Sequence, residues 1–206
     1  MVRLVPNILT FGRLVLTVVF IGMILYSPYA ANRPLFLDVA LVIFVVAGLT
    51  DIIDGITARK FNVASKFGRI TDPLVDKIMV CGVFICFGII GEPKLFGLAS
   101  GTLSVIRWSV ALIVVIREVY VTALRHIAEA RGINFAATVS GKVKMFLQSF
   151  AIGTVIIKMA HVPTAAWGDW VTTMVFAVML AVTVISGLRA TRRNSWKKAA
   201  CKGKGV

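Results

Sequence analysis

Long apolar runs constrain the fold of this chain more than any other feature. Hydropathy and breaker residues separate six of them, at about residues 8–26, 35–58, 73–90, 104–128, 143–160 and 168–188. As a helix, each run is long enough to cross the roughly 30 Å of hydrocarbon in a bilayer. With 58% hydrophobic residues and a mean hydropathy of +0.90, the chain is expected to be an all-α integral membrane protein with six transmembrane helices.

The domain organisation follows from the same pattern. No repeat, low-complexity segment or soluble domain separates the runs, so we expect one membrane domain over residues 1–190 and a basic tail over residues 191–206. The first run carries Arg13 and lacks a convincing small-residue cleavage site, which favours a retained helix over a signal peptide.

The net charge of +14 is distributed unevenly along the chain. Four Lys or Arg residues follow the second run, four follow the fourth and seven lie in the tail, whereas the other ends of the runs have only three or four. Because basic residues accumulate on the cytoplasmic side, this asymmetry predicts that both termini are cytoplasmic. The basic tail is then explained by topology and anionic lipid, and we expect no binding of nucleic acid.

Four aspartates, Asp51, Asp54, Asp72 and Asp76, interrupt this apolar chain within one short stretch. A charged side chain at mid-bilayer costs about 2.5–3.5 kcal/mol, so the group requires a compensating partner. On a helix that continues past the second run, Asp51, Asp54, Gly55 and Ala58 share one face. We expect the third helix to open at Asp72-Pro73, with Asp76 one turn later.

The stretch therefore predicts two acidic helix ends that face each other at the cytoplasmic side. Oxygen ligands of this kind suit Mg²⁺, Mn²⁺ or Ca²⁺ rather than zinc or copper, because no histidine or thiolate is close in the sequence. Packing of small residues between helices would account for Ala47, Gly48, Gly55 and Ala58 but not for the aspartates.

The spacing of these residues also resembles a known motif. Asp51, Asp54, Gly55, Ala58, Arg59, Gly68, Asp72 and Asp76 match all eight fixed positions of D-x2-D-G-x2-A-R-x8-G-x3-D-x3-D, the motif of the CDP-alcohol phosphotransferase family. The stretch Pro6-Asn7-x-Leu9-Thr10-x-x-Arg13 resembles the amino-terminal element of the same family. The resemblance implies the family fold of six spans, a homodimer and a bacterial-type inner (cell) membrane enzyme with a cytoplasmic active site.

The resemblance also implies roles for individual residues. Two Mg²⁺ or Mn²⁺ ions would be bridged by Asp51 and Asp72, with Asp54 on one ion and Asp76 on the other, where Asp76 also acts as general base. Binding of CDP-diacylglycerol would involve Asn7, Thr10, Arg13, Gly55, Ala58, Arg59, Ser65 and Gly68. In this set Gly55 and Ala58 leave room for the cytidine, and Arg59 offers a fork of donors to the diphosphate.

Cations in the second half of the chain indicate the acceptor. Arg117 and Arg125 lie on one face of the fourth helix, about 12 Å apart along its axis, and Lys142 and Lys144 follow on the same side of the membrane. Such a cluster suits an acceptor that carries its own phosphate. Alternatively, Arg117 pairs with Glu118 or with an aspartate of the second helix.

The residues around these cations resemble the phosphatidylglycerophosphate synthase branch of the family, although Met145 stands where that branch usually has threonine. The predicted reaction transfers the phosphatidyl group from CDP-diacylglycerol to sn-glycerol 3-phosphate and releases CMP. A sister enzyme with inositol phosphate or phosphatidylglycerol as acceptor is the near alternative. A divalent-cation transporter and a non-catalytic membrane scaffold are remote alternatives.

Overall fold

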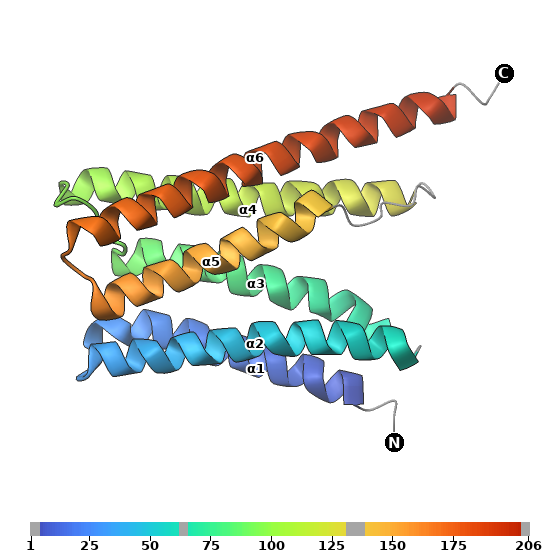
Figure 1. The fold of residues 1–206 in the computed structure, drawn as a ribbon. Coiled ribbons are helices and arrows are strands. Elements are labelled where there is room, and N and C mark those ends of the chain that lie inside the picture. The colour runs from blue at the N-terminus through green and yellow to red at the C-terminus, as the bar shows by residue number, and fades with distance from the viewer. Residues whose placement is uncertain (1–4, 62–65, 131–138, 203–206) are drawn as a thin grey trace.

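The computed structural model is a bundle of long helices that follow the six predicted runs (Figure 1). It describes residues 5–61, 66–130 and 139–202, with side chains over residues 11–50, 74–128 and 143–191. The elements are α1 (Val5–Tyr26), the short 3-10 helix η1 (Ser27–Tyr29), α2 (Arg33–Phe61), α3 (Lys66–Ile90), α4 (Ser100–Ala130), α5 (Val139–His161) and α6 (Ala166–Lys202). No strand occurs within these ranges, which confirms the prediction of an all-α chain.

Four of the helices are long and apolar enough to cross a membrane, judged over the described residues. They include the segments Phe11–Tyr29, Arg33–Thr50, Val143–His161 and Ala166–Thr191, in α1, α2, α5 and α6. In α3 the side chains are described only from Leu74 onward, and α4 carries four charged side chains before its last turn. A membrane protein is thus supported, while the count of six spans stays a prediction.

The helices form a closed ring. Each packs mainly on two neighbours, in the spatial order α1, α2, α5, α6, α4, α3 and back to α1, and α3 also has a smaller contact with α5. All six contribute to one apolar core, in which the tilted rings of Phe20 in α1 and Phe44 in α2 have their centroids 5.1 Å apart. Because α1 contacts both α2 and α3, it lies beside both of the helices that carry the four aspartates.

The bundle has two ends with different contents (Figure 1). We call one of them the terminal end, because both chain termini lie there. At this end α1, α3 and α5 begin, and α2, α4 and α6 end. At the turn end lie the connections from α1 to α2, from α3 to α4 and from α5 to α6. Among the described residues, the basic ends of α2, α4 and α6 and the basic starts of α3 and α5 lie at the terminal end.

Two helices extend further than predicted. The expectation that the third helix opens at Asp72-Pro73 is wrong, because α3 begins at Lys66 and Pro73 lies in its interior. Likewise, α6 continues through Lys202, so that most of the basic tail is helical. The predictions followed hydropathy, which falls where polar side chains begin, whereas helical backbone bonding continues through several polar turns.

One ion pair and several hydrogen bonds hold the segment 91–99 at the turn end. Gly91 ends α3 with φ +75°, a conformation that a residue without a Cβ adopts easily. The side chain of Glu92 accepts hydrogen bonds from Arg33 Nη2 at 2.8 Å and from the Lys94 backbone N at 3.1 Å. Asp169 of α6 accepts the backbone N–H of Phe96 at 2.7 Å. The turn end is therefore held by contacts among α2, α6 and the segment between α3 and α4.

Candidate active site

The fold brings the four predicted metal-binding aspartates to the terminal end of the bundle. Asp51 and Asp54 lie in the last turns of α2, and Asp72 and Asp76 lie in the second and third turns of α3. Of these four, only Asp76 has a described side chain, which is partly exposed. Among the described side chains no three His, Cys, Asp or Glu gather as metal ligands, so the predicted metal site depends on side chains outside the described residues.

The donor chemistry of these helix ends nevertheless fits a hard divalent cation. The four aspartates belong to two helices, α2 and α3, whose ends lie at the same end of the bundle. Of the two histidines of the chain, His161 lies at the turn end and His126 lies on α4, and neither belongs to a group of three possible metal ligands among the described side chains. Carboxylate oxygens without imidazole or thiolate are the ligand set that Mg²⁺ and Mn²⁺ prefer.

The predicted nucleotide-binding residues lie at the same end. Asn7 and Thr10 are in the first turns of α1, Gly55, Ala58 and Arg59 are in the last turns of α2, and Gly68 is in the first turn of α3. Their side-chain surroundings, and Ser65 as a whole, lie outside the described residues. The side chain of Arg13 is described, and only 2% of its surface is exposed.

A cavity of about 1120 Å³ opens beside Arg13 and Asp76. From these two polar residues it extends along α2 and α5 and reaches Trp167 and Gly168 of α6 at the turn end. Its wall is mostly apolar, and along α5 it covers residues 145–158, a rise of about 20 Å. The extension is mostly apolar, although Lys158 lines it near the turn end. A polar mouth with such an extension matches the two parts of a lipid that carries a charged headgroup.

Small residues widen this cavity. Gly48 of α2 lines it, and a methyl group placed there would meet no other atom within 4 Å. On the opposite wall, a methyl group on Gly153 of α5 would contact only Leu41 Cδ1, at 3.8 Å. Ala47, by contrast, is fully buried and also belongs to the core. The small face of α2 therefore serves helix packing at Ala47 and leaves open space at Gly48.

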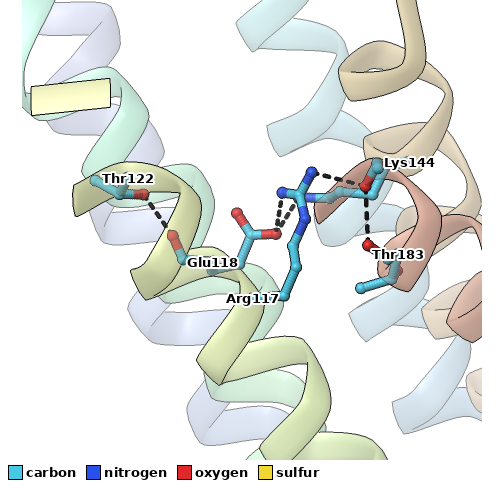
Figure 2. A network of polar contacts seen from close by, with 6 residues as sticks. Arg117, Glu118, Thr122, Lys144 and Thr183 are labelled. Carbon is cyan, nitrogen blue, oxygen red and sulfur yellow. Dashed lines mark hydrogen bonds and ion pairs between the residues drawn. The ribbon is translucent and has the colours of Figure 1, made fainter. Parts of the chain in front are cut away.

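Two of the predicted acceptor-binding cations meet at one carboxylate (Figure 2). Arg117 Nη1 of α4 donates to Glu118 Oε1 at 3.0 Å, and Lys144 Nζ of α5 donates to the same oxygen. Arg117 Nη2 also donates to Ser186 Oγ of α6 at 2.8 Å. The alternative that Arg117 pairs with Glu118 is thus confirmed, and the pair recruits Lys144 as a third member.

This cluster is largely shielded from solvent. The exposed fractions of the side chains are 12% for Arg117, 9% for Glu118 and 5% for Lys144. The Nε atoms of Arg117 and Arg125 are buried and have no hydrogen-bond partner among the described residues. Lys142 lies in the first turn of α5, but its side chain is outside the described residues. Unused donors beside a buried cationic pair are able to receive an anion.

The cationic cluster lies within electrostatic range of the candidate base. Asp76 of α3 is close enough to Lys144 for electrostatic interaction, and Lys77 is similarly close to Glu118 and Arg125. Sequence reasoning missed Lys77 and Ser186 as members of this region and treated Glu118 only as a partner of Arg117. The one signal for Glu118 was a carboxylate inside an apolar run, directly after an arginine.

Comparisons with known proteins agree with this arrangement. The family model described as CDP-alcohol phosphatidyltransferase matches residues 3–195. A protein of Mycobacterium tuberculosis named probable phosphatidylglycerophosphate synthase is 32% identical over 187 residues, covering 88% of this chain and 77% of its own length. The CDP-diacylglycerol–glycerol-3-phosphate 3-phosphatidyltransferase of Bacillus subtilis is 28% identical over 202 residues, covering 92% of this chain and 94% of its own.

A Rickettsia bellii protein with the same name as the Bacillus subtilis relative is also 28% identical, over 182 residues. It covers 88% of this chain and 90% of its own length. The match to the family model therefore spans all six helices, and these relatives align over most of their own length.

Proposed function

Because the chain belongs to the CDP-alcohol phosphatidyltransferase family, we propose that it transfers the phosphatidyl group of CDP-diacylglycerol to sn-glycerol 3-phosphate. The products are phosphatidylglycerophosphate and CMP. The observation that carries the choice of acceptor is the cluster of Arg117 and Lys144, in which Lys144 is within electrostatic range of Asp76, because an acceptor with its own phosphate needs fixed positive charge near the base. Serine or choline would not need it.

The lipid substrate fits the cavity between α2 and α5. Its charged headgroup would lie at the mouth near Arg13 and Asp76, and a diacylglycerol tail would extend along the apolar wall. Such a tail could enter sideways from the bilayer, because the cavity is long and apolar. The guanidinium of Arg13, 2% exposed, supplies a positive charge toward the diphosphate without the mobility of a surface side chain.

The reaction is a displacement at phosphorus. The hydroxyl oxygen of glycerol 3-phosphate forms the new bond to the lipid-side phosphorus, the diphosphate P–O bond breaks, and CMP leaves with its electron pair. Asp76 accepts the hydroxyl proton, for which it must come within hydrogen-bond reach of that hydroxyl. Asp51, Asp54, Asp72 and Asp76 would hold Mg²⁺ or Mn²⁺, which would neutralise charge on the diphosphate and the leaving group.

We propose further that all six helices cross a bacterial-type inner membrane, with the terminal end and both chain termini in the cytoplasm. α3 and α4 have 25 and 31 residues, more than the roughly 20 that a span requires. The excess of Lys and Arg at the terminal end supports this orientation. Residues 1–190 would form the membrane domain, and the basic segment 191–206 would lie on anionic lipid. The homodimer stays a prediction.

Purified protein tests the proposal directly. It is mixed with CDP-diacylglycerol, Mn²⁺ and one acceptor at a time: glycerol 3-phosphate, inositol phosphate, phosphatidylglycerol or serine. We expect CMP release with glycerol 3-phosphate at a rate well above the others. CMP release with inositol phosphate or phosphatidylglycerol, but not with glycerol 3-phosphate, would instead identify a sister enzyme. Metal uptake into proteoliposomes without any nucleotide lipid would identify a transporter.

A further inference from the structure

Glu118 occupies an unusual position between two helices. Its Oε1 atom accepts one hydrogen bond from Arg117, its neighbour on α4, and one from Lys144 on α5 (Figure 2). The backbone carbonyl of Glu118 also accepts the hydroxyl of Thr122 at 2.6 Å, an ordinary bond within the helix. The carboxylate is therefore the point at which α4 and α5 are joined by charge.

Without this carboxylate the two cations would not remain together. Two positive groups at short range repel, and the repulsion grows as water is excluded from around them. A buried charge is also tolerated only where it is paired. Glu118 meets both requirements, since it cancels one of the two positive charges and leaves the cluster of Arg117, Glu118 and Lys144 with a net charge of +1.

The cluster still has free capacity for an anion. A guanidinium has five N–H donors and an ammonium has three. Arg117 uses one donor on Glu118 and one on Ser186, and Lys144 uses one on Glu118. Among the described residues the other five donors have no hydrogen-bond acceptor, and one of them, the Arg117 Nε, is buried. An anion can therefore bind while both bonds to Glu118 stay intact.

We propose that Glu118 is a positioning residue for the acceptor: it holds Arg117 and Lys144 at one point so that their remaining donors converge on the phosphate of the acceptor. This inference rests on the proposed function. Glu118 itself touches neither the phosphate nor the reacting hydroxyl. Its removal should weaken binding of the acceptor even though it makes the cluster more positive, because a converging pair of cations is lost.

The Glu118→Gln variant separates position from charge, because the amide keeps the shape of the side chain and removes its charge. CMP release is measured while each substrate is varied in turn. We expect the KM for glycerol 3-phosphate to rise about 10-fold or more, as for loss of a charge-assisted hydrogen bond, while the KM for CDP-diacylglycerol changes less than about 2-fold. A merely structural defect would affect both substrates or neither.

Asp169→Asn is the matched control. It too removes the charge of a shielded carboxylate paired with a lysine, since Asp169 Oδ1 lies 2.9 Å from Lys158 Nζ, but it does so at the turn end. We expect its KM for glycerol 3-phosphate to stay at the wild-type value. Folding of each variant is checked by size-exclusion chromatography and helical circular dichroism.

The outcomes are distinct. An unchanged or lower KM for glycerol 3-phosphate in Glu118→Gln, or an equal rise for both substrates, would overturn the role of Glu118. If that variant does not fold, Glu118→Asp replaces it. Its charge is retained but withdrawn by one methylene, so a rise of about 3-fold for glycerol 3-phosphate alone supports the role and no rise refutes it. Wild-type protein inactive with glycerol 3-phosphate would contradict the proposed function instead.

Discussion

The ion pair between Lys158 and Asp169 should stabilise the turn end of the bundle. Lys158 Nζ lies 2.9 Å from Asp169 Oδ1 and also donates to the backbone carbonyl of Lys94. The exposed fractions of the two side chains are 4% and 11%. Lys158→Met removes both contacts and leaves the carboxylate of Asp169 without its counter-ion.

The magnitude follows from these contacts. An exposed pair contributes about 1 kcal/mol or less, and breaking a deeply buried one costs about 3–5 kcal/mol. For this shielded pair at the end of the bundle we take about 2 kcal/mol from those limits. The lost bond to the Lys94 carbonyl adds about 1 kcal/mol. A total of about 3 kcal/mol should lower the Tm by roughly 6–12 °C in a chain of this size.

A double-mutant cycle checks the argument. Tryptophan fluorescence is followed during thermal unfolding in detergent for wild type, Lys158→Met, Asp169→Asn and the double variant. Asp169→Asn keeps an oxygen that can accept the N–H of Phe96, so only the ion pair is lost. The free energy of unfolding should therefore fall by about 2 kcal/mol. The double variant should lower the free energy of unfolding by about 3 kcal/mol, rather than by the roughly 5 kcal/mol that the two single effects add up to. Additivity within about 0.5 kcal/mol would refute coupling between the two residues.

Three further predictions concern the terminal end and the cavity. Asp76→Asn should reduce the rate of CMP release at least about 100-fold, because the base is lost while the volume of the side chain is kept. The variant should elute and unfold like the wild type. A rate above about a tenth of the wild-type rate would exclude Asp76 as the general base. Excess EDTA should abolish CMP release and added Mn²⁺ restore it, whereas activity that survives exhaustive chelation would contradict the metal site. Gly153→Leu should slow turnover of long-chain CDP-diacylglycerol more than that of a short-chain analogue, with Gly101→Leu as a control outside the cavity; equal effects on both lipids would disprove the tail path.

The helices were predictable from the sequence because their determinants are local. Apolar length and breaker residues identified each run, and Gly91 does end α3, next to Ile90. Helix ends were less predictable. α3 begins at Lys66, seven residues before Pro73. The backbone hydrogen bonds of a helix form in polar turns as well as in apolar ones, but polar turns give no hydropathy signal.

The positions of the four aspartates on the helices were predictable because one motif contains them. The spacing of Asp51, Asp54, Asp72 and Asp76 placed all four at one end of two successive helices, as found. The meeting of Arg117 with Lys144 was not predictable in detail, because they belong to different helices and their contact depends on how α4 and α5 are rotated. The same holds for Glu118. The sequence shows that Arg117 is its neighbour, but it does not show that Lys144 on α5 is its second partner.

Contacts at the turn end were beyond sequence reasoning for a similar reason. From the sequence, Lys158 is only one of the few Lys or Arg residues at the ends of the runs away from the basic segments. Its actual role depends on the turn between α5 and α6, which brings Asp169 back against it. A single charge in an apolar run signals that some partner exists. It does not say which residue the fold will supply.

The most direct test of the central claim is a competition among acceptors. Purified protein receives CDP-diacylglycerol, Mn²⁺ and equal concentrations of glycerol 3-phosphate, inositol phosphate, phosphatidylglycerol and serine in one vessel, and the lipid products are identified by mass spectrometry. We expect phosphatidylglycerophosphate as the dominant product, formed in equal amount to CMP, and at least about 100-fold less of it with Asp76→Asn. A different dominant lipid, or CMP without any new lipid, would contradict the assignment.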